Sequence, residues 1–438
     1  MFVLHSHPVF VILAKNRRMS DLQEQLAELR QRVARINSKY DAPAPACESP
    51  DSPALARPAF HYVEEWLTGS EIETEYGKHF ETEKVYEHYR RHGSAEIGAL
   101  IDLPHDLLDP LSSGQMPHAS PEQWAFLDTE TTGLAGGTGT CAFLVGVGRI
   151  TREGFHVRQF FMRDYGEEAS LLDALTRHLA PFRVLITYNG RAFDQPLLET
   201  RYRLNRARPP FSNLDHLDLL YGARRLWKLR FDSCRLVDLE NQVLGVERHG
   251  DMPGALIPYV YFEYLRTRQA ARILPVFEHN ATDILTLACL TGIVPYAFQD
   301  AASASLKHGA EMAGIARWLR EAGEMEQSLA LFRRAIDAGL ADDLLFRTMW
   351  DVAMLERRHG SMDRALETWN DLGSAKNPFR VRALEELAKH HEHAEKNYER
   401  AMEFTRAALE LEESPELRKR EARISRRLTR THAHRKKA

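Results

Sequence analysis

Four short apolar runs between residues 124 and 188 limit the folds that this chain can adopt. They lie at 124–127, 141–147, 155–162 and 184–188, and each has the length of a buried strand. The sequence TREG at 151–154 joins the second run to the third and suits a tight antiparallel turn. Helical patterns occur at 168–179, 196–205, 236–244 and 274–290. This order of elements predicts an α/β domain over residues 119–297, a mixed sheet with flanking helices.

The residues before this domain have a different character. Residues 1–40 are expected to form a tail and then an amphipathic helix, in which Leu22, Leu26 and Leu29 start a coiled-coil spacing. That helix either packs on its own chain or forms a dimer. Residues 41–58 predict a linker, and residues 59–118 predict a small accessory module that contains a hairpin. The apolar run at 8–14 is too short to span a bilayer, so no membrane contact is expected.

The residues from 298 onward are wholly helical in pattern and repeat themselves. Ser328, Ala365 and Ala401 occupy the same place in three copies, at intervals of 37 and 36 residues. This resembles a tetratricopeptide array, whose period is about 34 residues, and it extends over 298–430. Such an array either binds a protein partner or braces the neighbouring domain. Residues 431–438 form a basic tail, and the basic stretch that begins after Leu417 suits a solvated helix or an arm that contacts phosphate.

Composition restricts the partners of the chain. The net charge of the 438 residues is −4, so any affinity for nucleic acid must come from a local patch or from bound metal. Four cysteines, at 47, 141, 234 and 289, show no short paired spacing. This argues against a zinc knuckle or a disulfide scaffold and indicates a reducing, cytoplasmic location.

The first group of chemically active residues stands at the end of an apolar strand. Asp128 and Glu130 follow the run 124–127, and strand alternation places residues i and i+2 on one face. Two carboxylates on one face are costly unless a cation neutralises them. Oxygen ligands of this kind favour Mg²⁺ or Mn²⁺. An exposed acidic turn is the ordinary explanation of such a pair, but here the pair follows a buried strand and precedes Gly133.

Two further groups follow along the chain. Asp194 comes after the strand at 184–188 and two residues before Pro196, where it can cap a helix or supply the second element of a carboxylate site. Phe193 beside it can pack in the core or stack on a base. His279 and Asp283 are four residues apart in a helical pattern and therefore share one face.

In this order the three groups resemble the DEDD (DnaQ-like) 3′–5′ exonucleases of the ribonuclease H-like superfamily. The Asp-x-Glu motif is matched by Asp128 and Glu130, the middle Asp by Asp194, and the final pair by His279 and Asp283. The closer likeness is to YprB-type proteins, through HLDLL at 216–220 and HNATDIL at 279–285. The resemblance covers residues 120–297 and implies an α/β ribonuclease H-like fold.

The resemblance also implies a mechanism. The four carboxylates would hold two divalent metal ions, Mg²⁺ or Mn²⁺, and His279 would act as general base in phosphodiester hydrolysis of single-stranded DNA or RNA. His279 departs from the family pattern in one respect. Members with His usually place four residues between His and Asp, and this chain has three, so His279 would approach the site from a different angle.

Two other functions are compatible with these residues. The chain can be a helical-repeat interaction protein with a weak or vestigial nuclease. The complete set of five site residues argues against a vestigial site, because an inactive site tolerates the loss of carboxylates. It can also be a structure-specific endonuclease, because the fold does not dictate end dependence. Asp218 can orient the site or cap the next helix, and further acids lie nearby at Asp215, Asp232 and Asp238. A basic segment can follow a phosphate backbone or form a solvated face; its members are Arg224, Arg225, Lys228 and Arg230.

Overall fold

The computed structural model describes residues 62–112, 114–133, 139–299 and 306–435, with side chains described to residue 430. The described residues all belong to the unit Phe60–Ala438. The expected N-terminal tail, amphipathic helix, dimer contact and linker lie outside these ranges. The same holds for the side chains of the basic tail at 431–438.

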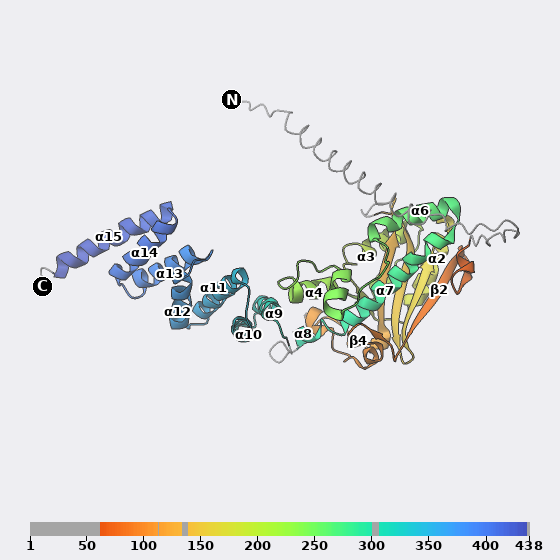
Figure 1. Ribbon diagram of the computed structural model, residues 1–438, viewed down its shortest axis with the longest axis horizontal. Helices are drawn as coiled ribbons and strands as arrows, with labels where there is room; N and C mark the ends of the chain where they lie inside the picture. The colour runs from red at the N-terminus through yellow and green to blue at the C-terminus, as the bar shows by residue number, and fades with distance from the viewer. Residues whose placement is uncertain (1–61, 113, 134–138, 300–305, 436–438) are drawn as a thin grey trace, which may run out of the picture. The chain divides into compact units, whose positions relative to one another are not determined.

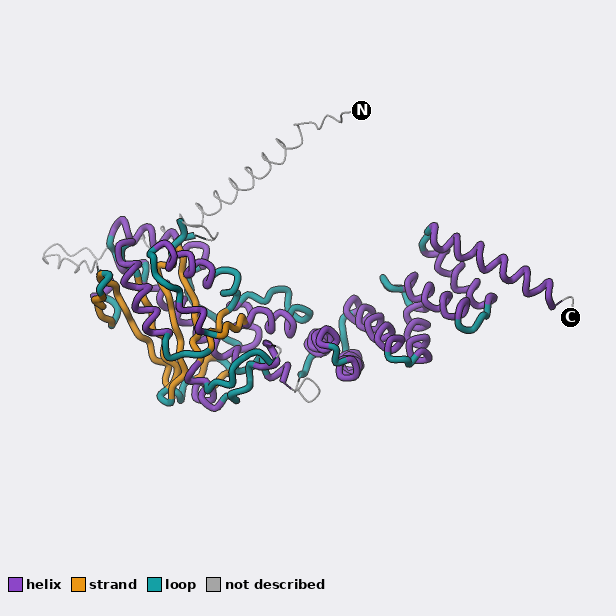
Figure 2. The backbone as a smooth tube through the Cα atoms, turned by 180° about the vertical axis from the view of Figure 1, so that it is seen from behind, coloured by secondary structure: helices purple, strands orange, loops and turns teal. Residues whose placement is uncertain are grey.

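A seven-stranded mixed sheet forms the centre of the α/β domain (Figures 1 and 2). Its order is β1-β2-β7-β6-β5-β8-β9, in which β5, β6 and β7 pair antiparallel while β8 and β9 run parallel to β5. This confirms the predicted mixed sheet and the turn at 151–154, where Thr151 pairs with Gly154. The strands are β1 Gly69–Thr74, β2 Gly77–Glu87, β5 Trp124–Thr131, β6 Ala142–Thr151, β7 Gly154–Phe161, β8 Val184–Thr187 and β9 Asp215–Asp218.

The hairpin predicted at the accessory module belongs to this sheet. Strand β2 pairs antiparallel with β7, from Phe80 opposite Phe161 to Glu87 opposite Gly154. Without β2, the backbone groups along that edge of β7 would be unpaired. The expected boundary at residue 119 is therefore not a boundary of the sheet, because β1 and β2 extend it. A separate two-stranded ribbon, β3 Arg91–His92 and β4 Ala95–Glu96, follows the hairpin.

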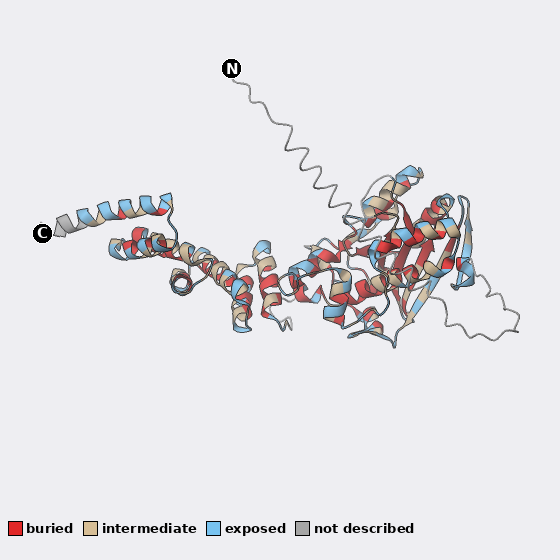
Figure 3. Ribbon diagram, turned by 45° about the horizontal axis from the view of Figure 1, so that its top comes forward, coloured by how far each residue is buried: buried red, intermediate tan, exposed pale blue. Residues whose placement is uncertain are grey.

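Helices cover both faces of the sheet, and the buried residues concentrate on the strands between them (Figure 3). On one face, Ala125 and Leu127 of β5 share a core with α2 Glu168–Leu179, α3 Asp194–Leu204 and α6 Ile257–Thr267. On the other, Trp124 and Phe126 pack with α4 Leu219–Trp227 and α7 Leu274–Thr291. The predicted helix at 236–244 is α5 Leu236–Leu239 followed by a π-helical turn, Glu240–Leu244.

Helix α7 is unusually apolar because it packs on β5, β6 and β7. Residues Ala270–Gln299 are long and apolar enough to cross a membrane by length and composition alone. However, 72% of the apolar window is buried inside the fold. Its composition is thus explained by its place in the core.

The region after residue 305 is all-helical, as predicted. Ser328, Ala365 and Ala401 are fully buried where neighbouring helices meet, and the Ser328 hydroxyl donates to the carbonyl of Ala316 at 2.7 Å. Small residues at these positions allow close helix packing; the tetratricopeptide assignment stays a prediction. The helices are α8 Tyr296–Gln299, which precedes the region, then α9 Gly309–Ala322, α10 Met325–Asp337, α11 Asp342–Arg358, α12 Met362–Ser374, α13 Arg380–His393, α14 Tyr398–Leu411 and α15 Pro415–Arg435.

Part of the basic segment in α15 is paired within the fold. Buried Glu392 of α13 accepts hydrogen bonds from Arg420 at 2.9 Å and from Arg423 at 2.6 Å. A buried carboxylate needs such partners. These two arginines therefore have a structural role. The sequence had indicated only a solvated helix or an arm that contacts phosphate.

Gly146 allows α7 to lie close to the sheet. It sits on β6 opposite Asp128, and a Cβ atom at this position would lie 2.2 Å from Oδ1 of Asn280 and 2.3 Å from Cδ1 of Ile284. Both partners belong to α7. Either the helix or its side chains would have to shift to make room for even a methyl group.

We therefore expect Gly146→Ala to lower the free energy of unfolding by about 1–3 kcal/mol, the usual cost of overpacking. Urea unfolding followed by circular dichroism measures this change. Gly254→Ala is the matched control, since its added Cβ would meet nothing within 4 Å and its φ is not positive. Equal unfolding midpoints for the two variants would contradict the packing argument.

His178 of α2 makes stability depend on pH. Its ring lies between Phe160 and Phe182, at centroid distances of 5.4 and 5.8 Å, and its Nε2 has no hydrogen-bond partner among the described residues. Burial, with the charges of Arg158 and Arg149, lowers its pKa to about 4. An unfolded His titrates near ~6.5, so between these values the unfolded chain binds the extra proton.

Stability should therefore fall as pH drops from about 6.5 to about 4. We expect His178→Phe to remove part of this loss, on the order of 1–2 kcal/mol. Chemical denaturation of wild type and variant at pH 7 and at pH 4.5 measures the difference. Parallel losses in the two proteins would show that His178 does not contribute.

Candidate active site

The residues singled out in the sequence lie around the end of β5. Asp128 and Glu130 project from the same face of β5, on the side where α7 packs. Asp194 is the first residue of α3, which follows β8, and β8 runs parallel to β5 beside it. Asp283 and His279 lie one turn apart on α7. The carboxyl ends of two neighbouring parallel strands and one crossing helix thus bring the five residues together.

The four carboxylates are buried and close enough to repel one another. Burial, and then the charges of Asp283, Glu130 and Asp194, raise the pKa of Asp128 well above its usual range. Burial also raises the pKa of Glu130 to about 8 and that of Asp194 to about 6. Four such acids cannot all ionise without a compensating cation.

Three of the four carboxylates, those of Asp128, Asp194 and Asp283, have a hydrogen-bond donor within the described residues. Asn280 of α7 donates from Nδ2 to Oδ2 of Asp128 at 2.9 Å, and Gln159 of β7 donates to Oδ1 of Asn280 at 2.9 Å. The Thr129 hydroxyl donates to Asp194. Gln159 and Asn280 were not identified from the sequence, because an amide inside an apolar strand or helix carries no spacing signal of its own.

Arg248 is the cation nearest to Asp283. Its Nη2 donates to Oδ1 of Asp283 at 2.5 Å, its Nε donates to buried Glu240 at 2.5 Å, and its Nη1 lies 3.2 Å from Asp251. Arg248 and Asp251 come from the segment between the π-helical turn Glu240–Leu244 and α6, which shows no periodic pattern in the sequence. Only the charged run ERHGD at 247–251 could have drawn attention to it.

His279 is held by Asp251. Oδ1 of Asp251 accepts from Nδ1 of His279 at 2.9 Å, and Nε2 lies 3.7 Å from Oδ2 of Asp283. Burial lowers the pKa of His279, but the hydrogen bond to Asp251 and the charges of Asp283 and Glu130 raise it to about 9. In this arrangement the ring is a cation near neutral pH, whereas a general base must be neutral. The assignment of His279 as base stays a prediction.

The donor set fits a divalent cation by its chemistry. Within the described ranges, no three Asp, Glu, His or Cys side chains are arranged to hold a metal ion. The four carboxylates are nevertheless buried oxygen donors that repel one another, and hard cations such as Mg²⁺ and Mn²⁺ prefer such donors. The residues that would hold the ions are Asp128, Glu130, Asp194 and Asp283.

Asp218 caps α4, the helix that follows it, which is one of the two roles that the sequence left open. It accepts from the backbone N–H of Leu220 at 3.1 Å, and it also accepts from Asn189 at 2.7 Å and Arg191 at 3.2 Å. It thereby ties the loop between β8 and α3, which leads to Asp194, to the start of α4. Phe193, beside Asp194, is 54% exposed and does not pack in the core.

Similarity to known proteins agrees with this architecture. Residues 125–294 match the family described as RNase_H superfamily, so the α/β domain is an RNase H-like domain of the nuclease type. The chain is also 33% identical over 286 residues to the uncharacterized protein YprB of Bacillus subtilis (strain 168), over 65% of this chain and 68% of that protein. The chain belongs to the YprB family within the RNase H superfamily. A domain of this class hydrolyses phosphodiester bonds and binds nucleic acid.

Proposed function

We propose that this protein is a metal-dependent 3′–5′ exonuclease that acts on single-stranded DNA or RNA. The observation that carries the proposal is the buried cluster of Asp128, Glu130, Asp194 and Asp283 in a domain of the RNase H superfamily. Two divalent ions, Mg²⁺ or Mn²⁺, would be the cofactors, and nucleic acid would be the substrate. The helical region after residue 305 is available to a protein partner.

The chain's own residues would prepare the site for hydrolysis. Bound divalent ions supply the Lewis acidity that activates water and stabilises the leaving oxygen. Asn280, itself fixed by Gln159, keeps one oxygen of Asp128 in place. Asp251 fixes the ring of His279 with Nε2 toward Asp283, where it can hold a proton. Arg248 forms an ion pair with Asp283 and offsets its charge.

Phe193 supports action at a strand end. Its exposed ring stands next to Asp194, and aromatic rings stack on bases of any sequence. A ring in this position can hold a terminal base while the adjacent phosphodiester lies at the carboxylates.

Asp128→Asn should reduce hydrolysis of a labelled oligonucleotide in Mn²⁺ by at least about 100-fold, since positioned metal ligands contribute several kcal/mol to the rate. Asp238→Asn is the control, because Asp238 is paired with Arg235 outside the site. Turnover of Asp128→Asn at the wild-type rate would refute the proposed mechanism, and a chelator should abolish wild-type activity.

Metal binding can be measured apart from activity. A ligand that binds only the folded state at about 100 times its Kd stabilises it by about 2.7 kcal/mol. Mn²⁺ should therefore raise the Tm of the wild type by several degrees and leave Asp128→Asn nearly unchanged. An equal rise in both proteins would place the bound metal elsewhere.

The mode of cleavage separates an exonuclease from a structure-specific endonuclease and from a vestigial site. We expect a linear single strand to be shortened from its 3′ end, and a circular strand of the same sequence to stay intact. Gel analysis of 5′-labelled and 3′-labelled substrates measures this. Nicking of the circle would favour the endonuclease, and no cleavage of either substrate would favour a helical-repeat interaction protein.

A further inference from the structure

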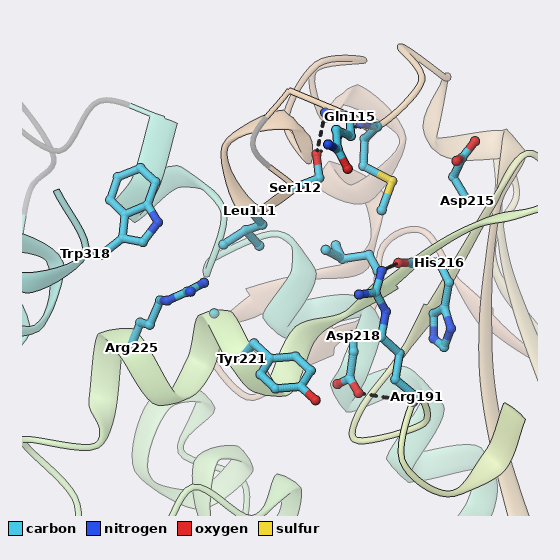
Figure 4. Close-up of a pocket in the computed structure, with 13 residues that line it drawn as sticks. Leu111, Ser112, Gln115, Arg191, Asp215, His216, Asp218, Tyr221, Arg225 and Trp318 are labelled. Atoms are coloured by element: carbon cyan, nitrogen blue, oxygen red, sulfur yellow. Dashed lines mark hydrogen bonds between the residues drawn. The ribbon is translucent and has the colours of Figure 1, made fainter. Parts of the chain in front are cut away.

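A cavity of about 450 Å³ is lined by residues of the loop that leads into α3 and by residues of β9 and α4 (Figure 4). Arg191 lines the cavity, and Asp194 follows three residues later as the first residue of α3. The remaining walls come from the segment around the 3-10 turn Asp109–Ser112 and from α9 of the helical region. The cavity is thus a neighbour of the candidate active site.

Two guanidinium groups enter this cavity. In Figure 4 Arg225 and Arg191 approach it from opposite sides, with the ring of Tyr221 between them. The side chain of Arg225 is in no ion pair or hydrogen bond with another residue in the described part of the chain. Arg191 donates one N–H to the carbonyl of His216, and a guanidinium has five such donors. Both cations therefore have donors left for an anionic ligand.

The acids at the cavity do not cancel these cations. Asp218 accepts three backbone N–H groups, from Asn189, Arg191 and Leu220, and so is committed to the fold. Asp215 is exposed and lies at the opposite end of the cavity from Arg225. An anion beside Arg225 would therefore be well separated from the free carboxylate.

Two aromatic rings stand beside the cations. Tyr221 is 49% exposed and precedes Arg225 by one turn of α4, so the two side chains share a face. Trp318 of α9 is half-buried, and its ring meets that of Phe298 edge to face at 5.0 Å. Aromatic rings with interspersed cations are the recognition mode of single-stranded nucleic acid.

The helix that carries Trp318 is fixed to the nuclease domain. A Cβ atom at Gly314 of α9 would lie 2.3 Å from the carbonyl oxygen of Arg225, so only glycine permits this approach. Glu311 accepts hydrogen bonds from Trp227 at 3.1 Å and from Arg230 at 2.6 Å. Trp318 lies one turn after Gly314, on the face of α9 that meets α4.

We infer that this cavity is a nucleotide subsite for a single strand of DNA or RNA, in which Arg191 and Arg225 contact phosphate while Tyr221 and Trp318 contact bases. Its volume falls within the range of about 300–1,000 Å³ that is usual for ligand sites. The inference rests on the proposed function and extends it. It assigns part of substrate binding to α9, the first helix of the all-helical region.

Binding of labelled oligonucleotides to the full chain tests the subsite without hydrolysis. Fluorescence anisotropy in a chelator, with DNA and RNA strands of about 12 nucleotides, gives Kd at one fixed salt concentration. Arg225→Ala and Tyr221→Ala should each raise Kd by about tenfold, which corresponds to the binding free energy of one stacked base or one charged contact. Unchanged Kd values for both variants would overturn the inference.

Arg224→Ala is the matched control. Arg224 is the next residue on α4 and carries the same charge, but it lines a different pocket, with Tyr188 and Lys228. A built subsite predicts that Arg224→Ala binds within twofold of wild type. An equal loss in Arg224→Ala and Arg225→Ala would show a general basic surface and refute the subsite.

The contribution of α9 has its own measurement. Stacking of a base on Trp318 should quench its fluorescence, so the quenching by added oligonucleotide should be smaller in Trp318→Phe than in wild type. Identical quenching would remove Trp318 from the subsite. Because these measurements need no turnover, they can succeed when hydrolysis fails. Loss of hydrolysis in Asp128→Asn with normal Arg225→Ala binding would instead refute the subsite alone.

Discussion

Repulsion among four buried carboxylates is the interaction on which the arrangement of this domain depends. Asp128, Glu130, Asp194 and Asp283 lie where water screens them little, and the pKa of each is raised. Such a cluster costs free energy unless cations or donors surround it. The contacts around it supply both: Asn280 and Thr129 donate hydrogen bonds, and Arg248 and His279 bring positive charge.

The fold can hold the cluster because rigid elements carry it. β5 and β8 run parallel and end at the same sheet edge, and α7 crosses that edge close to β6 because Gly146 has no side chain. Arg248 and Asp251 reach the cluster from a loop that is itself tied to Glu240. Positions set by strands and a packed helix vary less than positions set by loops, which would suit the proposed metal-binding role of these residues.

The sequence allowed prediction of the parts that depend on local periodicity. The four apolar runs correspond to β5, β6, β7 and β8. Strand alternation predicted that Asp128 and Glu130 share a face, and helix spacing predicted the same for His279 and Asp283. Strand β9 was not predicted, because its four residues Asp215–Asp218 include two acids and one His, and so show no apolar run. Arg248 and Asp251 were missed for a related reason. Their partners on α7, Asp283 and His279, are 35 and 28 residues away in the sequence, and no local sequence pattern indicates such a contact. The joining of β2 to β7 is a long-range pairing of the same kind.

The contact between α4 and α9 bears on how the two parts of the chain work together. Ile315 and Ala316 of α9 belong to the same hydrophobic core as Ala223 of α4 and Phe126 of β5. If the helical region were joined to the α/β domain only by a flexible linker, or if it were an independent binding module, the two would share no hydrophobic core and their contact would be solvated. Here the joint is buried and carries the Glu311 ion pair with Arg230, so a movement of α9 would cost packing in the nuclease domain. The first helix of the helical region, α9, is therefore mechanically coupled to the walls of the cavity beside Asp194.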